Sequence, residues 1–210
     1  MLIVRHSYSG DTIEIHVEDT KFFIPKSIIC RTSEFFKNTA KPEWEGEDGP
    51  RPVMLDEEDT ARIFKLYTVW LYNGSISRAD DSLKTWEPLS LAYVMGEKFL
   101  DVSFQAVILK YMFRRLIETG RRPSIETVNA IYCGTSDPSP ARCFMIDICV
   151  WVNRGCLGDI ENPAVELHED LVRDLLRALT AMPKPEETDS PWELDSGTYF
   201  KQLIRGGLLR

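Results

Sequence analysis

Residues 11–25 read DTIEIHVEDTKFFIP, and this run predicts that the fold begins with a β-hairpin. Its first half alternates apolar and polar residues, with Ile13, Ile15 and Val17 on one side and polar side chains on the other, which is typical of a half-buried strand over 12–17. The triplet Glu-Asp-Thr then supplies turn residues before a second strand over 21–24. Pro25 has the fixed φ of a first helical turn, so a short helix is expected directly after the hairpin.

After the hairpin, the pattern of apolar residues and capping signals predicts mainly helices. Ser33 is a candidate N-cap for a short helix that ends near Thr39. An acidic loop over 41–52 precedes a short apolar strand at 53–55. Asp59 is then predicted to cap a helix whose apolar residues recur with the helical period through Leu71, and Asn73-Gly74 provides the stop signal.

The remaining residues predict helices only. One helix is expected to start near Pro88 and the next at Asp101, with a boundary where Gly120 and Pro123 flank two arginines. Three more are expected over 125–132, 141–153 and 164–181, and residues 183–195, rich in proline and acid, are expected to be disordered. Apolar residues beyond them are expected to dock back on the body: Trp192, Tyr199, Phe200 and Leu203. The predicted fold class is α+β, a small mixed sheet flanked by helices and followed by an all-helical extension.

The composition narrows the classes of function. The 210 residues are 43% hydrophobic and 10% aromatic, which excludes a disordered, collagen-like or disulfide-scaffold chain. The net charge of −8 argues against direct nucleic-acid binding, which needs a concentrated positive face. Most of that charge lies in two segments, with eight acidic against two basic residues in 41–60 and five against one in 182–195. The rest of the chain is close to neutral.

Neither an export signal nor a metal motif stands out. The first ten residues hold only the short apolar run Leu2-Ile3-Val4, and no later run approaches the length of a membrane span, so we expect an intracellular protein, cytoplasmic or nuclear and not secreted. The five cysteines have no metal-ligand spacing, and buried, reduced thiols are expected. We therefore expect no cofactor and no metal.

No convergent set of catalytic residues is present. Glu14 and His16 share the polar side of the first strand, where an acid–base couple is one interpretation and a surface pair the favoured one. Cys30 is similarly read as a small core residue rather than a nucleophile. The basic pairs Arg114-Arg115 and Arg121-Arg122 have two interpretations, a favourable charge at a helix C-terminus or a binding site for an acidic partner segment. An enzyme is not expected.

Five motifs, in this order, resemble those of the BTB/POZ domain. They are Asp11-Thr12-Ile13, Phe22-x-Ile24-Pro25-Lys26-Ser27, Ser33-Glu34-Phe35-Phe36, Trp70-Leu71-Tyr72-Asn73-Gly74 and Tyr93-Val94-Met95-Gly96-Glu97-Lys98-Phe99-Leu100-Asp101, the last similar to short BTB proteins of filamentous fungi. The resemblance implies a BTB/POZ domain over 9–118, a helical C-terminal extension over 119–182 and an acidic tail over 183–210.

The resemblance also implies a function. Asp11 and Lys26 match a charged pair that lines the groove at the dimer interface of dimeric relatives. The chain departs from the family at Ile24-Pro25-Lys26, where Val-His-Lys is usual, and it has only ten residues before Asp11, fewer than the exchanged N-terminal elements of those dimers require. Ile76-Ser77-Arg78 lacks the hydrophobic-x-Glu pattern that strengthens cullin docking in some relatives.

The expected function is a non-catalytic protein–protein interaction module that self-associates or acts as a scaffold. The alternative is a substrate adaptor for a cullin-3-type ubiquitin ligase, with the surface at the end of the helix over 63–71, the 75–85 loop and the helix after it. The partners are therefore proteins, among them a second copy or a cullin, with neither membrane nor direct nucleic-acid contact. The candidate interaction residues are Asp11, Lys26, Ile76, Arg78, Trp86, Arg114 and Arg115.

Overall fold

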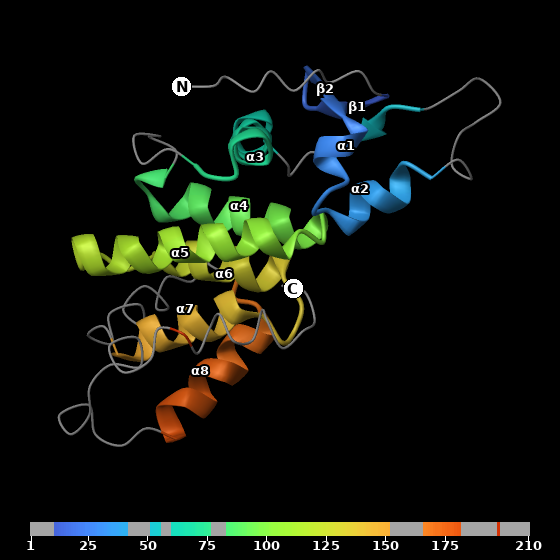
Figure 1. Ribbon diagram of the computed structural model, residues 1–210. Helices are drawn as coiled ribbons and strands as arrows, with labels where there is room; N and C mark the ends of the chain where they lie inside the picture. The colour runs from blue at the N-terminus through green and yellow to red at the C-terminus, as the bar shows by residue number, and fades with distance from the viewer. Residues whose placement is uncertain are drawn as a thin grey trace. The chain divides into compact units, whose positions relative to one another are not determined.

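The structure is a computed structural model that describes residues 11–41, 51–55, 60–76, 83–151, 166–181 and Gly197. Three strands and eight helices lie within these residues, which confirms the α+β class (Figure 1). The predicted disordered segment 183–195 and the docking residues Trp192, Tyr199, Phe200 and Leu203 lie outside them.

The chain divides into two compact units. Unit 1 contains Met1–Ile76 together with Phe99–Asp101, and unit 2 contains Ser77–Lys98 and Val102–Arg210. Each unit therefore uses two separate stretches of sequence. The predicted boundary near residue 118 does not coincide with this division, and it stays a prediction that rests on the resemblance and on the signals at Gly120 and Pro123.

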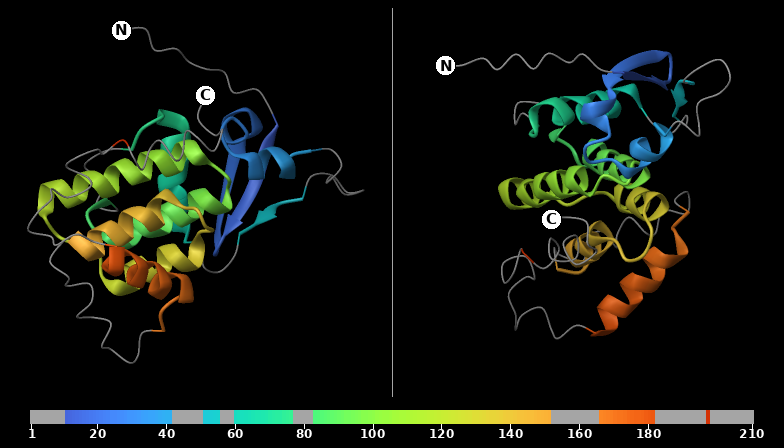
Figure 2. Two further views of the ribbon diagram at one scale, coloured as in Figure 1. Left: turned by 90° about the horizontal axis from the view of Figure 1, so that it is seen from below. Right: turned by 45° about the vertical axis from the view of Figure 1, so that its right-hand side comes forward.

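Unit 1 contains a three-stranded sheet with the strand order β2-β1-β3, and Figure 2 shows its strands as arrows. β1 (Thr12–Val17) and β2 (Thr20–Pro25) form the predicted antiparallel hairpin, with Ile13 opposite Ile24. β3 (Val53–Met54) pairs in parallel with β1, where Val53 lies opposite Ile15. The three apolar residues of β1 are buried, as their alternation predicts.

The helices of unit 1 begin and end at local signals. α1 (Lys26–Ile29) follows Pro25, and α2 (Glu34–Thr39) has the predicted N-cap, because the Ser33 hydroxyl accepts a hydrogen bond from the Phe36 N–H at 3.1 Å. The N-cap of α3 (Ala61–Asn73) is Thr60, whose hydroxyl accepts from the Ile63 N–H, so the prediction of Asp59, which lies outside the described residues, was wrong by one position. α3 ends at Gly74, whose φ of +66° is the left-handed conformation that glycine adopts without strain.

Residues 99–101 complete the core of unit 1. The Phe99 ring lies within 6 Å of those of Phe36, Phe64 and Tyr67, all fully buried. The Phe99 carbonyl accepts a hydrogen bond from the Ser33 hydroxyl at 2.6 Å. The buried Asp101 carboxylate accepts from the Tyr67 hydroxyl at 2.9 Å and from the Thr32 hydroxyl at 2.6 Å. This short segment is therefore joined to α2 and α3 by both packing and hydrogen bonds.

The described residues of unit 2 form the helices α4 (Trp86–Lys98), α5 (Val102–Thr119), α6 (Ile125–Gly134), α7 (Pro140–Trp151) and α8 (Glu169–Ala181). α4 lies alongside both α5 and α6, and α7 packs on α8 (Figures 1 and 2). α4 starts at Trp86, two residues before the predicted start. Ser124 caps α6, as predicted, by accepting from the Thr127 N–H.

One buried cation holds α6, α7 and α8 together. Arg142 on α7 is 6% exposed, and its guanidinium donates to the carbonyl of Tyr132 on α6 and to that of Thr135 directly after α6. It also donates to the Asp170 carboxylate of α8 at 3.1 Å and lies over the Tyr132 ring. A charge in the interior is tolerated when it is paired and hydrogen-bonded in this way.

Among the described helices, none combines the length and the apolar character that a membrane crossing requires.

Candidate protein-interaction surfaces

A groove of about 570 Å³ opens in unit 1 beside the sheet. It is bordered by β1, the Phe23 position of β2, α2, the start of β3 and Leu100. Its apolar lining includes Ile13, Phe35 and Val53, and polar side chains surround them. A concave surface with apolar walls and a few polar groups is suited to bind another molecule.

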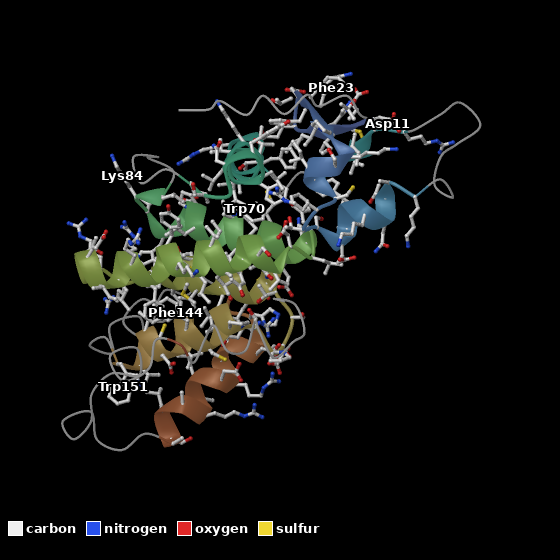
Figure 3. The ribbon with its side chains drawn as sticks, viewed as in Figure 1. Asp11, Phe23, Trp70, Lys84, Phe144 and Trp151 are labelled. Carbon is white, nitrogen blue, oxygen red and sulfur yellow. The ribbon has the colours of Figure 1, made fainter. Side chains whose placement is uncertain are left out.

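Two large apolar side chains of this groove are exposed. Phe23 is 59% exposed at the outer edge of the hairpin (Figure 3), and Leu100 is 53% exposed. Leu100 also has a φ of +50°, which is uncommon for a residue with a bulky side chain. The buried residues on either side hold it there, because Phe99 and Asp101 are both hydrogen-bonded into the core. The fold thus maintains an unfavourable backbone conformation that leaves an aliphatic side chain at the groove.

The predicted charged pair lies at this groove. Lys26 lines it, and its Nζ is 3.8 Å from Asp11 Oδ2. The Lys26 N–H donates to the Asp11 carbonyl at 2.8 Å, so the backbone fixes the two residues together. Because the Asp11 side chain is 87% exposed, the ion pair itself contributes only about 0–1 kcal/mol to stability. The sequence prediction that these two residues are neighbours is confirmed, whereas a role in dimerisation stays a prediction.

The Glu14 and His16 side chains form the surface pair that the sequence favours. His16 Nε2 lies 2.7 Å from Glu14 Oε1, and Lys21 Nζ lies 3.3 Å from the same oxygen. The hydrogen bond with His16 and that with Lys21 lower the pKa of Glu14 below its ordinary value. A carboxylate stabilised in its ionised form is a poor acceptor of a catalytic proton at neutral pH.

The cysteines differ in part from the expectation of buried thiols. Cys149 is buried, but Cys133 and Cys143 are exposed because they fall on the outer sides of α6 and α7. Burial raises the pKa of the Cys30 thiol, against the lowering effect of Lys26 and Lys37, so this thiol stays protonated at neutral pH. In the part of the chain that the structure describes, His, Cys, Asp and Glu side chains form no group of three or more suited to a metal ion.

Three further candidates meet in unit 2, at a second pocket of about 480 Å³. Arg114 and Arg115 line it from the end of α5. Trp86 was predicted as a contact residue, but its side chain is 6% exposed because it starts α4 and packs inside the unit. Its indole N–H donates to the Arg121 carbonyl at 2.9 Å, and the Arg115 guanidinium carbon lies 5.9 Å from its ring centre. Trp86 therefore supports this pocket from within rather than offering a surface of its own.

Of the other two candidates, Ile76 is buried and Arg78 is not described by the structure. Ile76 is only 4% exposed, so its choice as a contact residue is corrected: this side chain is part of the interior. Arg78 lies outside the described residues, as does most of the 75–85 loop on which the cullin-adaptor alternative depends.

Sequence reasoning missed the two exposed residues of the groove. Phe23 was read only as a strand residue, and Leu100 only as part of a motif. The position of Phe23 on the outward side of the predicted hairpin could have indicated an exposed apolar contact residue. The exposure of Leu100 depends on a backbone conformation that cannot be predicted from a sequence pattern.

Neither a protein-family model nor a curated protein matches the chain at a significant level.

Proposed function

We propose that the chain is a non-catalytic protein–protein interaction protein, that residues 9–118 form a BTB/POZ-type domain, and that the unit 1 groove mediates self-association. The observation that carries this proposal is the exposure of Phe23 and Leu100 at the groove. Complete burial of a large apolar side chain stabilises by about 1.5–3 kcal/mol, and because Phe23 and Leu100 are a little over half exposed, a partner that covers them gains roughly half of that for each.

The charges around the groove support a second copy as the partner. Asp11 and Glu14 are acidic, whereas Lys26 and Arg51 are basic, so one edge presents both signs. In a two-fold symmetric contact the same surface meets itself, and a surface with both signs can place its acids against its bases. The ordered motifs of the BTB/POZ family, in which Asp11 and Lys26 match a dimer-groove pair, support the same assignment.

Light scattering coupled to size-exclusion chromatography tests the proposal on the full chain. We expect a dimer at high micromolar concentration and a monomer for Phe23→Glu, because the substitution places a charge on the apolar contact. Ile117→Glu is the matched control, since Ile117 is 68% exposed on α5 in unit 2 and should leave the dimer intact. A strictly monomeric wild type would overturn self-association. A dimer that survives Phe23→Glu but not Ile117→Glu would place the contact elsewhere.

A further inference from the structure

The charged side chains that line the pocket at the end of α5 in unit 2 are mostly basic. Its charged lining consists of four basic side chains and one carboxylate: Lys84, Arg114, Arg115, Arg121 and Glu118. Glu118 Oε1 lies 3.9 Å from Arg114 Nε on the same exposed helix face, a weak pairing. Figure 3 shows Lys84 projecting near the start of α4, so the cations come from three separate segments of the unit. The whole chain is acidic, which makes this concentration of basic side chains unusual within it.

Arg115 carries the strongest sign that a partner group belongs here. Its Nε atom is buried and has no hydrogen-bond partner among the described residues. Burial lowers the pKa of its guanidinium, and the nearby positive charge of Arg121 lowers that pKa further. Both effects disfavour the charged form, although arginine stays charged at neutral pH. An anion in the pocket would reverse the repulsion and provide acceptors for the guanidinium donors.

Two hydrogen bonds at the C-terminal end of α5 are made by its own residues rather than by the arginine side chains. Cations near a helix C-terminus are favourable because the last carbonyls are without helical partners. In α5, however, the Thr119 hydroxyl donates to the Arg115 carbonyl at 2.7 Å, and the Gly120 N–H donates to the Leu116 carbonyl at 2.8 Å. Gly120 has a φ of +61°, the usual left-handed end of a helix. These contacts are made by Thr119 and Gly120, and no guanidinium group takes part in them.

Aromatic side chains hold the guanidinium groups in place before any ligand arrives. The Arg115 guanidinium lies against the Trp86 ring, and that of Arg114 lies 5.6 Å from the Tyr111 ring centre. The Trp86 indole N–H fixes the backbone at Arg121. Cations positioned in advance lose less conformational freedom on binding, which favours affinity.

We propose that this basic pocket binds an acidic segment of a protein partner, with partner carboxylates accepting hydrogen bonds from Arg114, Arg115 and Arg121. Carboxylates match the planar, bidentate geometry of arginine. The positive charge is confined to one concave site, which suits a short run of Glu and Asp side chains. A nucleic-acid duplex instead needs a long basic track for its phosphates. The site lies in unit 2 and does not depend on the groove of unit 1.

Fluorescence anisotropy with a labelled octaglutamate peptide tests the pocket on the full-length chain. We expect saturable binding at low ionic strength that is strongly weakened in about 0.5 M salt, where charges are screened within a few ångströms. Arg115→Gln should weaken binding about tenfold or more, the usual scale for one charge-assisted contact. The double variant Arg114→Gln/Arg121→Gln should weaken peptide binding to a similar extent while leaving the half-buried Arg115 unchanged.

Matched controls separate this site from others. Arg177→Gln removes an arginine that is 72% exposed on α8, and Phe23→Glu disrupts the unit 1 groove, so both should bind the peptide as the wild type does. Replacing the five acidic residues of 182–195 by their amides should also leave the affinity unchanged. A tenfold gain in that variant would overturn the proposal in favour of the chain's own segment as occupant. Absence of peptide binding, an equal loss in Arg177→Gln, or tighter binding of a duplex oligonucleotide would each overturn it as well.

Discussion

Among the described residues, each of the two units buries one charged side chain, and the two charges are paired with different kinds of partner. In unit 1 the Asp101 carboxylate is fully buried and receives hydroxyl donors from Thr32 and Tyr67. In unit 2 the buried Arg142 reaches both backbone carbonyls and a carboxylate, Asp170, whose side chain is 27% exposed. The first charge is linked to side chains of the core, and the second extends to the surface.

The two buried charges connect different parts of the sequence. Asp101 connects the short 99–101 segment to residues more than thirty positions earlier, so its bonds complete unit 1 from a distant part of the chain. Arg142 instead closes α6, α7 and α8, which follow one another along the chain. We therefore expect the loss of either charge to destabilise its own unit most, and the following variants test that expectation.

The largest effect is expected for Arg142→Ala. It leaves the Tyr132 and Thr135 carbonyls without their buried donor and removes the partner of Asp170, so the free energy of unfolding should fall by about 3–5 kcal/mol. Urea denaturation measures the loss, and amide hydrogen exchange should rise most in peptides of α6 and α7. Arg173→Gln, which removes an exposed partner of the same carboxylate, should cost less than about 1 kcal/mol. Equal losses in the two variants would show that the buried contacts contribute little.

Asp101→Asn should have the next largest effect. The amide keeps the size of the side chain but loses the charge that receives two hydroxyl donors, and hydrogen bonds to charged groups contribute about 1.5–3 kcal/mol. Amide exchange should rise in peptides of α2 and α3. Asp19→Asn in the hairpin turn, where the residue is exposed, is the control and should be close to neutral. Faster exchange in α7 rather than α3 would contradict the assignment of Asp101 to unit 1.

Elements with a regular period could be predicted from the sequence. The hairpin and α3 were predicted at the correct positions because their apolar residues repeat every two residues or with the helical period. The parallel pairing of β3 with β1 was not predicted, since a two-residue strand has no period and its partner lies far away in the chain. Asp11 and Lys26 were found by resemblance, but Leu100 needs its backbone conformation to be known.

The role of Arg142 shows why burial could not be predicted from local pattern. It lies in the run Ala141-Arg142-Cys143-Phe144, where a single arginine normally indicates the solvent side of a helix. Its partners come from α6 and from Asp170, twenty-eight positions later, and only the packing of three helices brings them together. The same reason explains Trp86, which was assigned to the surface because its contacts with Arg115 and Arg121 are not local.

Close helix packing in unit 2 gives a prediction of intermediate size. A Cβ at Gly134 would lie 2.3 Å from a methyl carbon of Val94, so Gly134→Ala should force α4 and α6 apart and cost about 1–3 kcal/mol. Val94→Ala removes both methyl groups, and the double variant should therefore be more stable than Gly134→Ala alone. Gly96→Ala should cost less, because the nearest atom to its Cβ, Gln105 Cγ, would lie farther away, at 2.8 Å. A loss at Gly134 that Val94→Ala does not relieve would contradict the clash.

The smallest expected effect is a pH dependence of the free energy of unfolding that arises from Asp170 in unit 2. Partial burial raises the pKa of Asp170, but the hydrogen bond from Arg142 and the charge of Arg173 outweigh this, so the pKa lies below its ordinary value. A carboxyl group whose pKa is lower in the folded state stabilises the fold above its unfolded pKa of about 3.9, and this stabilisation is lost as the pH falls through the folded pKa.

The free energies of unfolding of wild type and Asp170→Asn, measured between about pH 6 and pH 2, isolate this contribution. Their difference should be constant at the upper end and shrink as the pH falls, because Asp170 is protonated in both states at the lower end. Glu14, whose pKa is also lowered, titrates equally in both proteins and cancels from the difference. A difference that does not change with pH would mean that the Arg142–Asp170 contact contributes no charge-dependent stability. Unit 2 would then tolerate its buried arginine through the backbone carbonyls alone, much as unit 1 tolerates Asp101 through hydroxyl groups.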